Sequence, residues 1–286
     1  MHRNLTFVVA ILANHLAIGC MSPSSEGSGT TGKRLSLQTR LAIKDDLAKP
    51  FQNSLGWNIT ISKAFVSVGA LYYYSGDPVL SQRSPPSSTA PHRMTQILDL
   101  FVGTAHAHPG HYIEGAAMGQ MTQPQTVDLL GGAIDLADGE GVSGSTNSAT
   151  FTWQTPPHGD LAPALDGQVI LTQGTATKDG ATIQFVAKAN ANEVLDGDKK
   201  AEVAGCAFGS KPGEVGVEMN DDGTVTLTMV PSVWFNQVDF DYVVRGAANA
   251  PLPNDDGVVD IAGTLAWQGF VRGIKKGTAY EFAYTK

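Results

Sequence analysis

Residues 167–175 (GQVILTQGT) and 181–189 (ATIQFVAKA) flank the tripeptide Lys178-Asp179-Gly180. Both flanks alternate apolar and polar residues, which is the pattern of half-buried β-strands. An Asp-Gly pair supplies the left-handed backbone that a two-residue hairpin turn requires. The stretch therefore predicts an antiparallel hairpin. It also leads us to look for further β-strands in the rest of the chain.

Segments of similar character recur on both sides of this hairpin. Residues 34–43 place Leu35, Leu37, Thr39 and Leu41 on one face of a strand. Further strands are predicted for 57–63 and 64–74 (as a pair or as one long bent strand), 127–136, 149–154, 258–261 and 278–285. A second Asp-Gly turn at 220–223 predicts a hairpin between 214–219 and 224–230.

Helical spacing is confined to two short segments. Residues 94–101 fit about two turns, and residues 265–274 fit one helix with Leu265, Phe270 and Ile274 inward. Many short strands with few helices favour a mainly β fold. We expect an antiparallel β-sandwich or barrel-like domain with one or two short helices, over 34–286.

The N-terminus has the features of an export signal. Residues 5–18 are mostly apolar but too few to span a bilayer comfortably. They end at Leu16-Ala17-Ile18-Gly19-Cys20, which resembles a bacterial lipobox. We expect a signal peptide over 1–19, acylation of Cys20 and a flexible tether over 20–33, the alternative being an ordinary secretory signal. The Pro- and Ser-rich stretch 75–92 predicts a mobile loop.

Charge narrows the classes of partner. The formal net charge is −8, and the pI is about 5.3. The sequence has no basic stripe, which argues against a nucleic-acid partner. Through the lipid on Cys20, the expected contact is instead a membrane.

Three histidines lie within six residues, His106-Ala107-His108-Pro109-Gly110-His111. A residue before proline is extended, so His106 and His108 project from the same side of the chain. Pro109-Gly110 fits the centre of a type II turn, which brings the α-carbons of His108 and His111 within about 7 Å. Three imidazoles can thus face one point, and this geometry predicts a metal site.

The identity of the metal depends on the ligands that accompany the imidazoles. Glu114, Met118 and Met121 follow the histidines. In a helix they would lie near the face of His111, whereas in a strand Glu114 and Met118 would share a face without Met121. Thioethers favour Cu(I), and histidines with Glu114 alone suit zinc equally well. The prediction is copper or zinc, against the alternative that the turn binds nothing and the methionines fill the core.

The remaining histidines and the second cysteine carry weaker signals. His92 and His158 read as surface histidines. With Cys20 consumed by lipid, Cys206 is the one thiol left in the mature chain. It is expected to be a buried free thiol, and the alternative is a thiolate ligand to copper.

Three stretches carry a resemblance to other sequences. Residues 56–60 (GWNIT), 68–74 (VGALYYY) and 105–112 (AHAHPGHY) resemble a group of uncharacterised bacterial secreted lipoproteins. The resemblance supports an extracytoplasmic protein. Together with the leader and Cys20, it predicts a lipid-anchored protein of the bacterial cell envelope that faces the periplasm or the cell surface. It implies no activity.

Three functions compete for this set of features. The first is a non-catalytic metal carrier, buffer or sensor that serves a membrane transporter or receptor. The second is a surface module for glycan or protein partners. Its aromatic platform would draw on Trp57, Tyr72, Tyr73, Tyr74 and Trp153, although core packing explains most of these rings. The third is a metal-dependent hydrolase with Glu114 or Asp128 as base, which lacks the support of an H-E-x-x-H or G-x-S-x-G motif.

Overall fold

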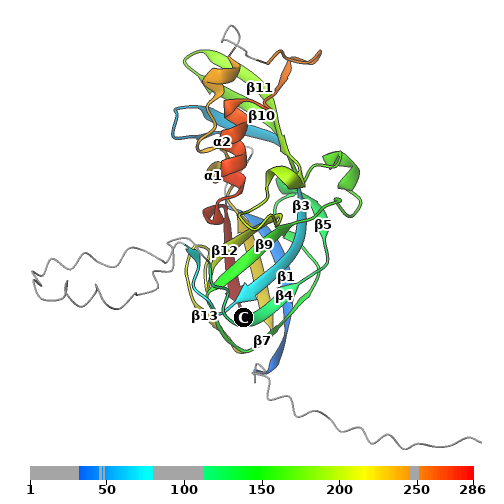
Figure 1. Cartoon of the computed structure of the whole chain (residues 1–286), viewed down its shortest axis with the longest axis vertical. Coiled ribbons are helices and arrows are strands. Elements are labelled where there is room, and N and C mark those ends of the chain that lie inside the picture. Colours follow the sequence, from blue (N-terminus) through cyan, green and yellow to red (C-terminus); the bar gives the residue numbers. More distant parts are fainter. Residues whose placement is uncertain (1–31, 45–46, 48, 80–111, 245–250) are drawn as a thin grey trace, which may run out of the picture. The chain divides into compact units, whose positions relative to one another are not determined.

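The predicted mainly β class is confirmed by the structure, a computed structural model (Figure 1). It describes residues 32–44, 47, 49–79, 112–244 and 251–286. Strands make up 46% and helices 15% of the described residues. The predicted signal peptide, most of the tether, the helix at 94–101 and all but 75–79 of the loop lie outside the described residues. Gly32–Lys286 form one compact unit.

Eight strands close into a barrel, which decides between the two predicted architectures. In order around the barrel they are β3 (Asn58–Tyr74), β4 (Ala117–Met121), β7 (Gly139–Val142), β1 (Arg34–Ile43), β14 (Gly223–Met229), β16 (Tyr280–Thr285), β12 (Glu202–Gly209) and β9 (Ser148–Trp153), and β9 pairs again with β3. Most of these pairs are antiparallel, as expected, but β1–β14 and β12–β16 are parallel. Barrels of eight strands have interiors that side chains can fill.

One long strand, β3, continues the sheet of the barrel beyond the barrel itself. Residues 68–74 of β3 belong to the barrel, whereas its first half pairs with β10 (Ile170–Lys178). The sheet continues from β10 to β11 (Ala181–Ala189) and β15 (Val258–Asp260), and β2 (Phe51–Gln52) and β5 (Gln125–Asp128) also pair with β3. Of the two alternatives for residues 57–74, the single long strand is therefore correct, and it begins at Asn58.

The hairpin that opened the sequence argument is present as predicted. Lys178 and Ala181 are paired, so Asp179 and Gly180 form a two-residue loop. Both loop residues have positive φ, 51° and 80°, which is the backbone of a type I′ turn.

The second predicted hairpin is wrong. β13 (Val217–Met219) pairs with β8 (Gly144–Thr146), and β14 lies between β1 and β16. The polar turn between β13 and β14 is bonded to these neighbours: Asp222 Oδ1 accepts from Ser36 N at 2.8 Å, and Tyr284 Oη donates to Asp221 O at 2.7 Å. Both edges of β14 are taken by strands distant in sequence, so the local Asp-Gly signal does not decide its partner.

The strand predicted for 127–136 is interrupted. Asp128 Oδ1 accepts from Leu130 N at 3.0 Å and caps the 3-10 turn η2 (Leu129–Gly131). The chain resumes strand pairing at β6 (Ile134–Asp135). A side chain that bonds to nearby backbone competes with the ladder in this way.

The two α-helices, α1 (Pro231–Phe235) and α2 (Leu265–Ile274), contact each other and lie beside β10 and β11 (Figure 1). The bounds of α2 agree with the prediction, and Thr264 Oγ1 caps its N-terminus by accepting from Trp267 N. Leu265 is 49% exposed, so its predicted inward position is wrong, whereas Phe270 and Ile274 are buried. The other short helices are 3-10 turns, η3 (Ala162–Leu165), η4 (Ala191–Glu193), η5 (Phe240–Val243) and η6 (Gly277–Ala279).

Large side chains fill the barrel. The Phe151 and Tyr280 rings stack with centroids 4.7 Å apart, and the Tyr73 and Phe208 rings lie 5.3 Å apart. Two strands contribute glycines where these rings need room: a β-carbon at Gly119 would lie 2.9 Å from the Tyr73 ring, and one at Gly141 would lie 2.9 Å from Leu37. Both described surface pockets are lined mostly by exposed or partly exposed residues, together with the buried Leu35, Met118 and Gly141 in one and Val203 in the other.

Replacing Gly273 with alanine is expected to destabilise the protein by about 1–3 kcal/mol, although alanine favours helices. A β-carbon at Gly273 would collide with the backbone of Trp234 in α1, which has no flexible end to move aside. Chemical denaturation checks the change. Gly197→Ala is the matched control, because a β-carbon there meets no atom within 4 Å. A stabilised Gly273→Ala variant would contradict the close helix packing.

Candidate functional site

The predicted ligands His106, His108 and His111 lie outside the described residues. Tyr112, bonded to His111 in the chain, is the first described residue after them. Its hydroxyl is 2.7 Å from Ser148 Oγ, and its ring meets the Tyr74 ring edge-on at 6.3 Å. Burial raises the pKa of Tyr112 to about 12, so the hydroxyl stays protonated at neutral pH. The chain that leaves the histidine stretch is thus held against β3 and β9.

Glu114 lies at the surface, just after this attachment. Its backbone carbonyl accepts from Gly76 N at 2.8 Å. Its carboxylate is close enough to Tyr74 and Tyr112 to contribute to their raised pKa values, behind the larger effect of burial. The side chain lines a surface pocket of about 420 Å³ together with the carboxylates of Asp196, Asp198 and Glu202.

The carboxylates of this pocket are partly neutralised. Lys200 Nζ lies 3.4 Å from Glu202 Oε1, and Lys275 Nζ donates to Leu195 O. Burial raises the pKa of Glu202. Within the described part of the chain, no three His, Cys, Asp or Glu side chains are grouped so as to hold a metal ion. A metal ion beside Glu114 would therefore depend on the histidines.

The two methionines are core residues. Met118 and Met121 are 7% and 1% exposed, and both belong to the hydrophobic core. Residues 117–121 form a strand, so the helical alternative for 112–121 is wrong. A register shift against Tyr73 and Tyr74 leaves Met118 without a partner, and such a bulge turns two nearby side chains to one face. This placement favours the alternative that the methionines fill the core.

Cys206 is a buried free thiol, as expected. It lies in β12, and its Sγ donates to Val203 O at 3.3 Å. Burial raises its pKa to about 12. A metal ligand must be the thiolate. The raised pKa therefore argues against the copper-thiolate alternative.

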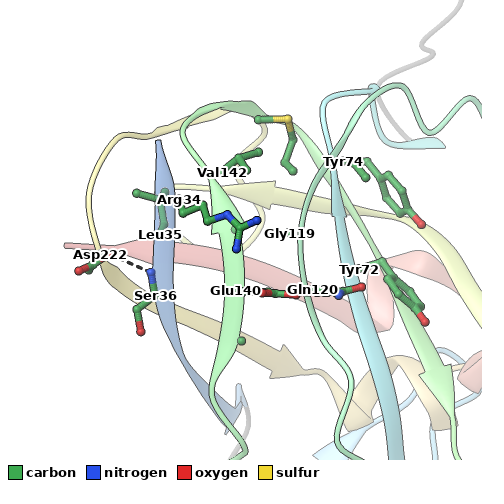
Figure 2. A pocket seen from close by; sticks show the side chains of 14 residues that line it. Arg34, Leu35, Ser36, Tyr72, Tyr74, Gly119, Gln120, Glu140, Val142 and Asp222 are labelled. Carbon is green, nitrogen blue, oxygen red and sulfur yellow. Dashed lines mark hydrogen bonds between the residues drawn. The ribbon is translucent and has the colours of Figure 1, made fainter. Parts of the chain in front are cut away.

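Three of the five candidate platform rings are core residues, which agrees with the expectation that core packing explains most of them. Trp57, Tyr73 and Trp153 are buried. The β3 strand has alternate residues on opposite faces, so Tyr73 points into the barrel while Tyr72 and Tyr74 point outward. These two outward tyrosines line a groove of about 830 Å³ on the outer face of the barrel (Figure 2).

No protein-family model, curated protein or solved structure matches this chain. Asp128, the alternative candidate for a catalytic base, accepts a hydrogen bond from Leu130 N and thereby caps η2. His158 is exposed, as predicted. In the described ranges, no helix is long and apolar enough to cross a membrane.

The groove was not predicted from the sequence, because two of the strands that form it, β4 and β7, were not predicted. β4 and β7 contain Gly119, Gly139 and Gly141, so neither shows an apolar alternation. The signal that was present is the outward-facing polar residue of each strand, Gln120 between Gly119 and Met121 and Glu140 between Gly139 and Gly141.

Proposed function

We propose that this chain is a lipid-anchored extracytoplasmic protein that binds a copper or zinc ion through His106, His108 and His111. The observation that carries the proposal is the density of imidazoles around a Pro-Gly turn. Its role is that of a carrier, buffer or sensor. Acylated Cys20 would hold the protein at the membrane of the bacterial cell envelope, where a transporter or receptor can exchange the ion with it.

The position of Tyr112 supports this proposal. The hydroxyl contact with Ser148 and the ring contact with Tyr74 attach the end of the histidine stretch to the barrel. Attachment lowers the entropy that a short ligand loop loses when it closes on an ion.

The ligands beside this attachment narrow the choice of ion. Glu114 is exposed and offers a carboxylate, whereas Met118 and Met121 are buried. Imidazole with carboxylate suits Zn(II) and Cu(II), and Cu(I) prefers the softer thioethers. We therefore favour a divalent ion, with Glu114 as the candidate fourth ligand.

Alanine at His106, His108 and His111 together is expected to weaken metal binding by about 100-fold or more, which is about 2.7 kcal/mol. The measurement is competition of Gly32–Lys286 with a chromophoric chelator for Zn(II), Cu(II) and Cu(I). The His158→Ala variant removes an exposed histidine and serves as the control. Equal affinity in the triple variant and the parent would contradict the proposal. Hydrolytic or redox turnover by the metal-loaded protein would move the assignment from carrier to enzyme.

A further inference from the structure

A line of polar side chains crosses the outer face of the barrel from β1 to β3 (Figure 2). Ser36 is paired with Glu140, Glu140 with Gln120, and Gln120 with Tyr72. Residues paired directly across neighbouring strands share a face and lie about 5 Å apart. The four side chains therefore form one continuous row over four strands, and all four line the groove of about 830 Å³.

The floor of the groove is partly backbone. Gly119, Gly139 and Gly141 line it, and two of them have no room for a side chain on the interior face. A β-carbon at Gly119 would meet the Tyr73 ring, and one at Gly141 would meet Leu37. The residues that fill the barrel thus keep Gly119 and Gly141 as glycine, and the backbone of both residues lines the groove.

One wall of the groove is aromatic. Tyr72 and Tyr74 are two residues apart on β3, so their rings lie on the same face. Both are partly exposed. The Tyr74 ring is held from behind by the edge-on Tyr112 ring, with centroids 6.3 Å apart. The pair offers a fixed apolar surface with hydroxyl groups at its rim.

The polar lining has spare hydrogen-bonding capacity and little net charge. Gln120 Nε2 donates to Glu140 Oε1 at 3.0 Å, which aligns the two groups and leaves the Gln120 carbonyl and Glu140 Oε2 free of that bond. Asp222 Oδ1 accepts from Ser36 N at 2.8 Å, and Arg34 lies at the same end. The charged residues that line the groove are Arg34, Glu140 and Asp222, and the other lining residues are neutral. Two carboxylates against one cation disfavour an anionic ligand such as phosphate.

From these features we propose that the groove binds a neutral oligosaccharide. A sugar ring has an apolar C–H face that fits a tyrosine ring and a rim of hydroxyls that fits paired amide and carboxylate groups. The elongated row over four strands matches a chain of sugar units rather than a compact ligand. The proposal goes beyond metal binding and does not depend on it, because the groove lies on Tyr72, Gln120 and Glu140.

Tyr72→Ala is expected to raise the dissociation constant for the bound sugar at least about tenfold. The probes are chitotetraose, cellotetraose and maltotetraose, screened against Gly32–Lys286 by saturation-transfer NMR and quantified by calorimetry. Tyr72→Phe keeps the ring and is expected to bind within about threefold of the parent. Tyr242→Ala removes a tyrosine that is 49% exposed elsewhere and is the matched control.

Two further variants keep the outcome decisive. If Tyr72→Ala fails to fold, Gln120→Ala removes the central amide and must weaken binding instead. The His106, His108 and His111 triple variant is expected to bind sugar like the parent, so failure of metal binding and failure of sugar binding are separable. Absence of binding to all three probes, or equal loss in Tyr242→Ala, would overturn the proposal.

Discussion

Replacing Phe151 with alanine is expected to lower the free energy of unfolding by about 3–5 kcal/mol. The ring is fully buried in the barrel. It stacks on Tyr280 at 4.7 Å and meets the Trp153 ring edge-on at 4.8 Å. Because these neighbours come from a closed sheet, they cannot collapse far into the space that the ring leaves. The cavity is therefore expected to persist. The loss of unfolding free energy should accordingly lie at the upper end of the range seen when a large core residue is replaced by a small one.

Urea unfolding followed by tryptophan fluorescence measures this loss. The m-value should stay constant, since the change leaves the surface exposed on unfolding almost the same. Tyr242→Ala is the control, because Tyr242 is 49% exposed, and its effect should stay within about 0.5 kcal/mol. A Phe151→Ala loss below about 1 kcal/mol would be inconsistent with a filled, closed barrel.

The elements that the sequence predicted well are those whose signal is local. β1 alternates between exposed and buried residues along its first eight positions, and its inward leucines were identifiable from that period. The Asp179-Gly180 turn dictated its hairpin because the loop needs positive φ at both residues. The α2 helix was bounded by its capping threonine and its apolar spacing. In each case the deciding interaction lies within a few residues.

The elements that the sequence did not predict depend on distant neighbours. Gly119 and Gly141 break the strand pattern, yet they are required by Tyr73 and Leu37 on the neighbouring strands β3 and β1, which are distant in sequence. The Asp-Gly turn before β14 does not indicate that β1 will pair with β14 in parallel. Such pairings are set by the closure of the sheet, and the sequence of a strand does not indicate which strand will pair with it.

The same distinction applies to the candidate site. The histidine stretch was identifiable because its ligands are adjacent in sequence. Whether Met118 faces the histidines or the core was not, because a bulge opposite Tyr73 and Tyr74 decides it. The groove required Ser36, Glu140, Gln120 and Tyr72 to be aligned over four strands, which only the register reveals.

High pH is expected to destabilise the protein strongly, because three acidic groups are buried inside it. Burial raises the pKa of Cys206 from 9.0 to about 12. It also raises the pKa of Tyr73 and Tyr280 well above their usual value of 10.0. The Tyr280 hydroxyl donates to Ile274 O at 2.7 Å, a bond that its ionised form cannot make. In the unfolded chain the three groups ionise freely near their ordinary pKa values.

The direction of the effect follows from the protons bound in each state. Above pH 9 the unfolded chain loses protons that the folded protein keeps, so the free energy of unfolding falls as the pH rises. The stabilisation is complete below pH 9, and for Cys206 it is lost between pH 9 and about 12. Each group contributes a slope of up to about 1.4 kcal/mol per pH unit, which makes the protein roughly 5 kcal/mol less stable at pH 11 than at pH 8.

Urea unfolding at intervals from pH 8 to pH 11 tests this expectation. Cys206→Ala should lose the part of the slope that begins near pH 9, about 3 kcal/mol by pH 11, while the tyrosine part beginning near pH 10 remains. A stability that is flat to pH 11 would contradict the burial of these groups. An unchanged slope in Cys206→Ala would instead assign the whole effect to the tyrosines. If the pH dependence of the unfolding free energy changes in Cys206→Ala, the loss of stability at high pH originates in the hydrophobic core. Cys206, Tyr73 and Tyr280 belong to that core together with Phe151.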